Sequence, residues 1–141
     1  PLCTALIQHA GATWSSRNHR PRESIARYDA AIAAWAAAGD AAREAAAWLG
    51  LTEQHWRAAD YAAAIDAATR AETLARVSDQ PYFATRARME RCLALDALGD
   101  AAAVDVCLEG LPERYAELGE LNDAANARTS QASIALERGD V

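Results

Sequence analysis

The residues of this chain that could do chemistry are three cysteines and three histidines, and their spacing matches no familiar reactive arrangement. Zinc sites and metalloprotease helices show short, regular spacings such as Cys-x-x-Cys or His-Glu-x-x-His. No such spacing occurs among Cys3, Cys92, Cys107, His9, His19 and His55. Glu53 and His55 are separated by one residue on a predicted helix, so their side chains point in different directions. A zinc site built from Cys92, Cys107 and one histidine is the alternative.

Phosphate-binding loops are missing from the sequence as well. It contains no Gly-x-Gly-x-x-Gly, and a Walker loop is excluded because the chain has no lysine. We therefore predict that the protein is not an enzyme and that it uses neither a metal nor a cofactor.

Charge and hydropathy exclude further classes of protein. The net charge of −6 argues against binding to nucleic acid or to anionic membranes, and no uncharged apolar run reaches the length of a membrane span. The odd number of cysteines, without a Cys-x-x-Cys, predicts no disulfide framework and favours a reducing compartment, hence the cytoplasm. Alanine, glycine and arginine without lysine are typical of a GC-rich genome.

A small residue followed by an acidic one recurs about every twenty residues and sets the element boundaries. Glycine suits the left-handed conformation that ends many helices. Aspartate suits the N-cap, where its carboxylate accepts a hydrogen bond from an unpaired backbone N–H. The pairs are Gly39-Asp40, Ala59-Asp60, Ser78-Asp79, Gly99-Asp100, Gly119-Glu120 and Gly139-Asp140.

These pairs divide residues 1–141 into seven helices of a single all-α domain. Residues 15–20 form a polar turn after the first helix, and Gly110 and Pro112 break the sixth helix near 110–112. Short loops make neighbouring helices antiparallel, and the 38 alanines predict close packing with thin cores. The helices are expected near 2–14, 21–38, 41–58, 60–77, 81–98, 100–118 and 120–138.

Two consecutive helices make a unit of about forty residues that resembles the tetratricopeptide repeat. The best match is Trp48-x-x-Leu51-Thr52-x-x-His55 followed by Ala59-Asp60-Tyr61-x-x-Ala64-x-x-x-Ala68-x-x-Ala71. Thr52, His55 and Ala68 depart from the usual glycine, tyrosine and aromatic residue. Such lengthened repeats are similar to those of bacterial signalling proteins, including regulators of the maltose-activator type. The resemblance implies a right-handed α-α superhelix, a solenoid, over about residues 21–140.

The resemblance also implies a concave groove lined by the helices at 41–58, 81–98 and 120–138. The family's groove positions fall on Ala46, Leu49, Glu53, Trp56, Arg86, Met89, Leu93, Asp96, Asn126, Thr129, Ser133 and Leu136. Aromatic, methionine and arginine side chains are common anchors at protein interfaces. Trp56 is interpreted either as such an anchor or as a core residue, whereas Trp48, Trp35 and Tyr28 are expected to pack inside.

The acidic residues Asp105, Glu109, Glu113 and Glu117 recur every four positions. On a continuous helix they would form one stripe. We interpret them as a solvated outer face, with a contact for a basic partner as the alternative.

We expect a protein–protein interaction or scaffold module that binds a peptide or a partner helix, or another domain of its own protein, in this groove. The alternative is a self-associating or passive spacer between effector domains. Because the chain begins at Pro1 without methionine and ends just after Gly139-Asp140, we expect it to be a fragment of a longer bacterial signalling or regulatory protein.

Overall fold

The computed structural model describes residues 2–17 and 21–139, and throughout these ranges the regular structure is α-helical, without strands. This confirms the all-α prediction. The helices are α1 (Leu2–Arg17), α2 (Pro21–Ala38), α3 (Ala41–Arg57), α4 (Tyr61–Val77), α5 (Pro81–Ala97), α6 (Ala101–Leu108), α7 (Leu111–Glu117) and α8 (Leu121–Arg138).

The predicted boundaries hold to within about a residue, apart from the end of the first helix. Residues 15–17, expected in a turn, continue α1. The remainder of that expected turn, residues 18–20, lies outside the described residues.

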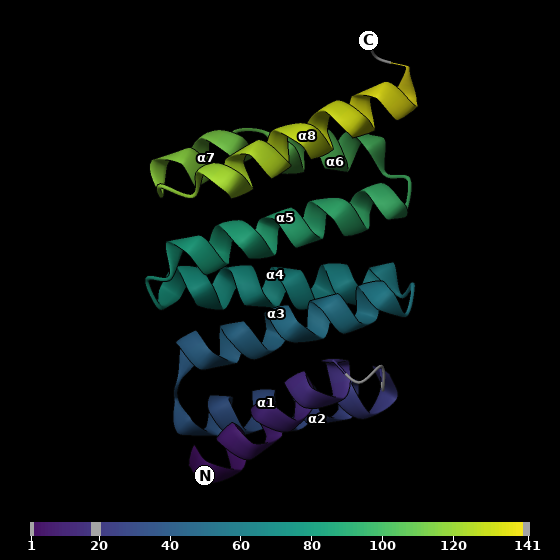
Figure 1. Ribbon diagram of the computed structural model, residues 1–141. Helices are drawn as coiled ribbons and strands as arrows, with labels where there is room; N and C mark the ends of the chain where they lie inside the picture. Colours follow the sequence, from purple (N-terminus) through teal and green to yellow (C-terminus); the bar gives the residue numbers. More distant parts are fainter. Residues whose placement is uncertain (1, 18–20, 140–141) are drawn as a thin grey trace.

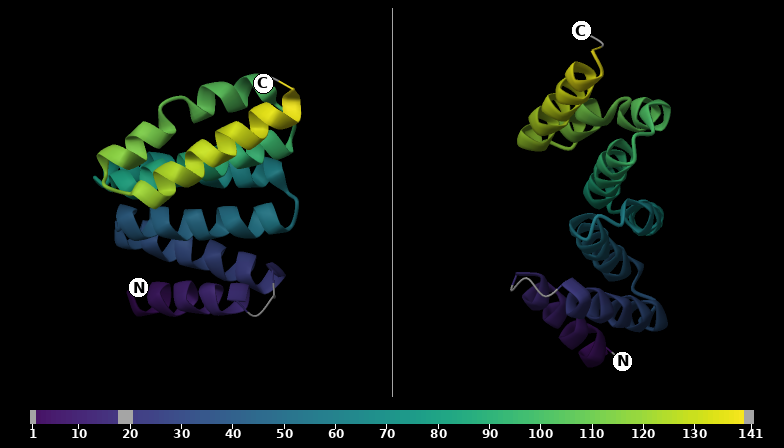
Figure 2. Two further views of the ribbon diagram at one scale, coloured as in Figure 1. Left: turned by 45° about the horizontal axis from the view of Figure 1, so that its top comes forward. Right: turned by 90° about the vertical axis from the view of Figure 1, so that its right-hand side faces the viewer.

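The chain reverses direction from one helix to the next, except that α7 continues onward from α6 in the same layer, so the molecule is a layered stack with α1 and α8 near opposite ends (Figure 1). Seen along the helices, the chain zigzags between two sides of the stack (Figure 2). Contacts also join alternate helices on one side, α1 to α3 and α3 to α5. The Tyr82 hydroxyl on α5 donates to Asp123 on α8, so α3, α5 and α8 share one face built from side chains far apart in the sequence.

The reversals at Gly39-Asp40, Ala59-Asp60 and Gly99-Asp100 combine a left-handed helix end with an aspartate N-cap, as these pairs predict. At the first corner the Gly39 N–H donates to the Ala36 carbonyl at 3.1 Å and the Asp40 N–H donates to the Trp35 carbonyl at 3.1 Å, which is the hydrogen-bond pattern of a Schellman cap. The Asp40 carboxylate accepts from the Arg43 N–H at 3.0 Å and so starts α3. One residue thus finishes one helix and begins the next. Asp60 and Asp100 accept equivalent bonds.

The third corner corrects the sequence reading by one residue. The left-handed position is Asp79, with φ of 54°, and not Ser78. The N-cap of α5 is Gln80, whose side chain makes no capping bond, so Pro81 starts the helix with a fixed φ and no N–H to satisfy. With this correction, left-handed residues occur at 39, 59, 79, 99, 119 and 139, at a constant step of twenty residues.

The core is bulky at the two ends of the stack and thin in the middle. Trp35 and Tyr28 are buried in a cluster shared by α1, α2 and α3, with half-buried Trp48 packed against it. Leu111 and Tyr115 lie in a second cluster spanning α5 to α8. Between these clusters the buried residues of α4 are mainly alanines, which confirms the predicted close packing and the internal positions of Trp35 and Tyr28.

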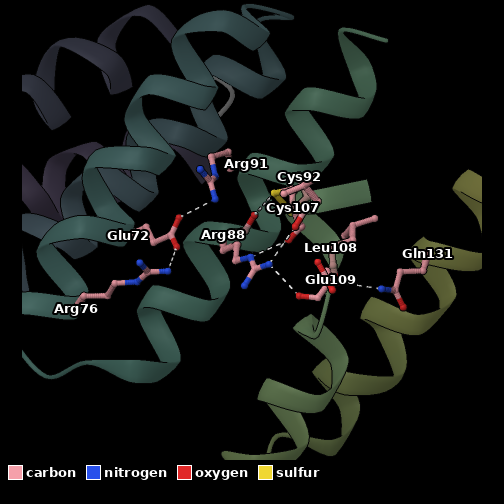
Figure 3. The surroundings of a disulfide bond; sticks show 10 residues. Glu72, Arg76, Arg88, Arg91, Cys92, Cys107, Leu108, Glu109 and Gln131 are labelled. Carbon is pink, nitrogen blue, oxygen red and sulfur yellow. Dashed lines mark hydrogen bonds and ion pairs between the residues drawn. A yellow bond between two sulfur atoms is a disulfide. The ribbon is translucent and has the colours of Figure 1, made fainter. Parts of the chain in front are cut away.

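The predicted break in the sixth helix is confirmed: α6 ends at Leu108 and α7 begins at Leu111. Gly110 between them adopts a left-handed conformation with φ of 68°, which few residues other than glycine tolerate. The carbonyls that α6 leaves unpaired accept bonds from Arg88 on α5 and Gln131 on α8 (Figure 3). Neighbouring helices therefore stabilise the break.

The expectation that no disulfide forms was wrong. Cys92 on α5 and Cys107 on α6 are joined in a disulfide, with Cα atoms 5.5 Å apart (Figure 3). The corner at Gly99 folds α6 back along α5 and brings the two thiols together. The zinc alternative is overturned with it, because both cysteines are used, and Cys3 is left as an exposed free thiol. The argument for a reducing compartment, which assumed unpaired cysteines, no longer holds.

Candidate partner-binding face

Two adjacent hollows lie on the face formed by α3, α5 and α8. The α3–α5 hollow has a volume of about 380 Å³ and is lined by Ala46, Leu49, Gly50, Glu53, Phe83, Arg86 and Glu90. The α5–α8 hollow has a volume of about 350 Å³ and is lined by Tyr82, Arg86, Met89, Glu90, Tyr115, Asp123, Asn126 and Ala127. Arg86 and Glu90 line both hollows, so the two form one continuous feature centred on α5.

The structure brings together part of the residue set expected for the groove. Six of the expected positions line one hollow or the other: Ala46, Leu49, Glu53, Arg86, Met89 and Asn126. They come from the middle of α3, the middle of α5 and the first half of α8. The expected groove and the two hollows therefore coincide over about two helical turns.

The other expected positions line neither hollow. Trp56 is 44 % exposed near the end of α3 and makes an edge contact with Tyr61 of α4. Asp96 lies 3.6 Å from Arg138 in an ion pair. The Thr129 hydroxyl donates to the Ala125 carbonyl of its own helix. Leu93 is half-buried, and Ser133 and Leu136 are exposed further along α8.

Five residues of the α5–α8 hollow were missed by the sequence reading: Tyr82, Glu90, Tyr115, Asp123 and Ala127. Glu90 follows Arg86 by four residues, so the two share a helix face, and that spacing could have found it. The Tyr82 hydroxyl donates to the Asp123 carboxylate at 3.2 Å. These two residues are 41 positions apart, about one repeat unit, so the hydrogen bond joins the first turns of α5 and α8.

Burial sets the electrostatics of these side chains. It raises the pKa of the Glu90 carboxyl, an effect that the positive charge of Arg86 opposes and the negative charge of Glu53 reinforces. It also raises the pKa of Tyr115 and of Tyr82, and in both cases the carboxylate of Asp123 adds to the effect. Both tyrosines therefore keep their hydroxyl protons at neutral pH, and Tyr82 remains a donor to Asp123.

A further hollow of about 450 Å³ lies on the other side of the stack, bounded by α4, α5 and the α6–α7 break. Its buried carboxylate, Glu72, pairs with Arg76 and with Arg91, the latter at 3.1 Å (Figure 3). Arg88 in the same hollow is engaged by the end of α6. Since Glu72 and Arg88 are bound by groups of the same chain, we assign them a role in stabilising the fold.

The acidic residues at 105–117 do not form one stripe, since α6 and α7 are separate helices. Asp105 lies 2.7 Å from Arg138, Glu117 lies 2.9 Å from Arg114, and Glu113 lies 3.8 Å from Arg128. Their negative charge is thus largely balanced by arginines of the same chain, and the region offers little to a basic partner.

The histidines of the described residues lie in unrelated places. His9 accepts a hydrogen bond from the buried Trp35 indole at 3.3 Å, and His55 lies 4.0 Å from the Asp60 carboxylate at a corner. Across residues 2–17 and 21–139, no three side chains of histidine, cysteine, aspartate or glutamate gather as metal ligands. In the same residues no helix is both long and apolar enough to span a membrane.

Comparisons of the sequence with known proteins identify no family for this chain. No protein-family model matches the chain, and a search of curated proteins returned no match.

Proposed function

We propose that this chain is a protein-interaction module that binds a peptide or a partner helix on the face of α3, α5 and α8. The observation that carries the proposal is the pair of adjacent hollows that share Arg86 and Glu90. Together they offer apolar walls, aromatic rings and charged side chains within one continuous feature, a composition that suits a binding surface. The proposal includes the tetratricopeptide-like character of the repeats and a superhelical curvature with this face on the inside.

The other expectations about the setting of this module stay predictions. They are a role as a scaffold in a larger bacterial signalling protein, no nucleic-acid or membrane partner, and a cytoplasmic location. The last of these has lost the support of unpaired cysteines, because Cys92 and Cys107 form a disulfide.

The test is affinity capture from the source cells with a charge reversal at the shared residue. We expect Arg86→Glu to lose partners that the wild-type chain retains. Arg70→Glu is the matched control, because Arg70 is exposed on α4, outside both hollows. Circular dichroism checks that both variants remain helical. Equal recovery of every partner by Arg86→Glu would contradict the proposed face.

A specific observation favours self-association as the second candidate function. Helix α1 exposes a set of large apolar side chains: Leu2, Leu6, Ile7 and Trp14 are each at least 50 % exposed. Large exposed apolar patches often mark protein contacts. If two copies pair through α1, Ile7→Glu should turn a concentration-dependent dimer into a monomer in sedimentation-velocity experiments, and a wild-type chain that is monomeric at all concentrations would remove this candidate.

A further inference from the structure

The α5–α8 hollow combines aromatic rings with carboxylates in a way that suits one kind of ligand group. Tyr82 and Tyr115 stand edge to face, with ring centroids 6.4 Å apart. Glu90 and Asp123 contribute two carboxylates to the same hollow, against the single guanidinium of Arg86. Aromatic faces and carboxylates both attract cations. The hollow is therefore complementary to a positively charged group.

Glu90 is the residue in this hollow whose carboxylate a bound cation would stabilise most. Its side chain is half-buried, and within the described residues its carboxylate forms no hydrogen bond or close ion pair, although the positive charge of Arg86 acts on it from nearby. A buried charge is costly unless it is paired. Burial accordingly raises the pKa of the Glu90 carboxyl. A cation entering the hollow would supply the missing counter-charge.

Asp123 adds a second acceptor on the opposite wall. It accepts one hydrogen bond, from the Tyr82 hydroxyl, and an ionised carboxylate has room for several more. Arginine suits this arrangement better than lysine, since its planar guanidinium stacks on aromatic faces and carries five donors.

We propose that the α5–α8 hollow receives an arginine side chain of the bound partner segment, held by Glu90 and Asp123 beside the rings of Tyr82 and Tyr115. The inference rests on the proposed function, which supplies the partner. The net charge of −6 acts in the same direction, because it attracts basic segments at long range. Arg86 lines this hollow and the α3–α5 hollow, so the rest of the partner segment has a donor beside the arginine site.

The test uses a small probe, Nα-acetyl-arginine N-methylamide, followed by NMR chemical shifts of the intact chain at low salt. The citrulline analogue has nearly the same shape but no charge, and it serves as the probe control. We expect the arginine probe to shift signals of Tyr82, Glu90 and Asp123 with a dissociation constant of about a millimolar. The citrulline analogue should leave these signals unchanged.

Variants make the assignment specific. Glu90→Gln keeps the shape of the side chain and should weaken probe binding about tenfold, whereas the exposed Glu109→Gln makes the same charge change away from the hollow and should leave it unchanged. If Glu90→Gln fails to fold, Asp123→Asn is expected to show the same loss.

Equal binding of the arginine and citrulline probes, or binding unaffected by Glu90→Gln, would overturn the arginine site. Because the probe needs no partner protein, this result is independent of the capture experiment with Arg86→Glu. Loss of the arginine site alone would leave the proposed binding face standing. A capture experiment without any Arg86-dependent partner would instead count against the proposed function.

Discussion

The side chain of Arg88 on α5 holds the carboxyl end of α6, where its Nε donates to the carbonyl oxygen of Cys107 at 2.7 Å. Its Nη2 also donates to the carbonyl oxygens of Glu109 at 2.9 Å and Val106 at 3.3 Å. These carbonyls accept no hydrogen bond from a following helical turn, because α6 ends at Leu108. Arg88 therefore satisfies the backbone groups that the break between α6 and α7 exposes.

Replacing Arg88 should destabilise the chain substantially. We expect Arg88→Met to lower the free energy of unfolding by about 2 to 4 kcal/mol, because several charge-assisted hydrogen bonds are lost together. Arg88→Lys should recover only part of this, since a lysine cannot reach three carbonyls with a planar fork. Urea unfolding followed by circular dichroism measures the change. Arg70→Met, at an exposed site on α4, is the control, and an equal effect at both sites would contradict the role of Arg88.

Reduction of the Cys92–Cys107 disulfide is expected to lower stability by about 3 kcal/mol, the value for a closed loop of about this length. The urea midpoint of the wild-type chain should fall when dithiothreitol is added. A double variant with alanine at both positions should not respond to the reductant, whereas Cys3→Ser should respond as the wild type does. Three free thiols in the unreduced, unfolded chain would show that the disulfide is not formed.

The two corners without glycine offer stabilising substitutions. Ala59 and Asp79 adopt φ values of 57° and 54°, a conformation that costs an L-residue about 1 to 2 kcal/mol. Glycine avoids that cost but loses more chain entropy on folding. We expect Ala59→Gly and Asp79→Gly each to raise the free energy of unfolding by about 0.5 to 1 kcal/mol.

The neighbouring Ala58, with φ of −82°, provides the control for these corners. Ala58→Gly gains nothing from conformational freedom and should destabilise by about 0.5 to 1 kcal/mol. The urea midpoint should therefore rise for Ala59→Gly and fall for Ala58→Gly. A loss of stability at Ala59→Gly similar to that at Ala58→Gly would refute the argument from backbone conformation.

Local signals along the chain were sufficient to predict most of the helices. The Gly39-Asp40 and Gly99-Asp100 pairs mark corners because the left-handed cap and the N-cap are properties of adjacent residues. Contacts between helices were harder to foresee. The disulfide could have been inferred from the corner itself, since Cys92 lies seven residues before Gly99 and Cys107 lies eight residues after it. Two antiparallel helices bring positions at nearly equal distances from the corner side by side.

At the candidate site, too, the sequence predicted positions within one helix better than contacts between helices. Leu49, Arg86 and Met89 were assigned to the groove from repeat positions, and all three line a hollow. Glu90 was not predicted, because the repeat positions on α5 include its neighbour Met89 instead. Tyr115 could not be foreseen, since it reaches the hollow only because the chain breaks at Gly110 and redirects α7. Irregular elements are thus where a repeat pattern gives the least information.

Stability should fall as the pH is lowered below neutrality, through His9. Burial lowers the pKa of His9 below its usual value near 6.5, so the folded chain binds this proton less readily than the unfolded chain. The contribution of neutral His9 is therefore complete above about pH 6.5 and is lost progressively below it. Protonation of Nδ1 would also remove the acceptor of the Trp35 indole, whose side chain is only 1 % exposed. We expect the urea midpoint of the wild-type chain to fall between pH 7.5 and pH 5.5, and His9→Gln, which cannot take up this proton, to show a smaller fall. An identical pH dependence in both proteins would assign the effect to other groups.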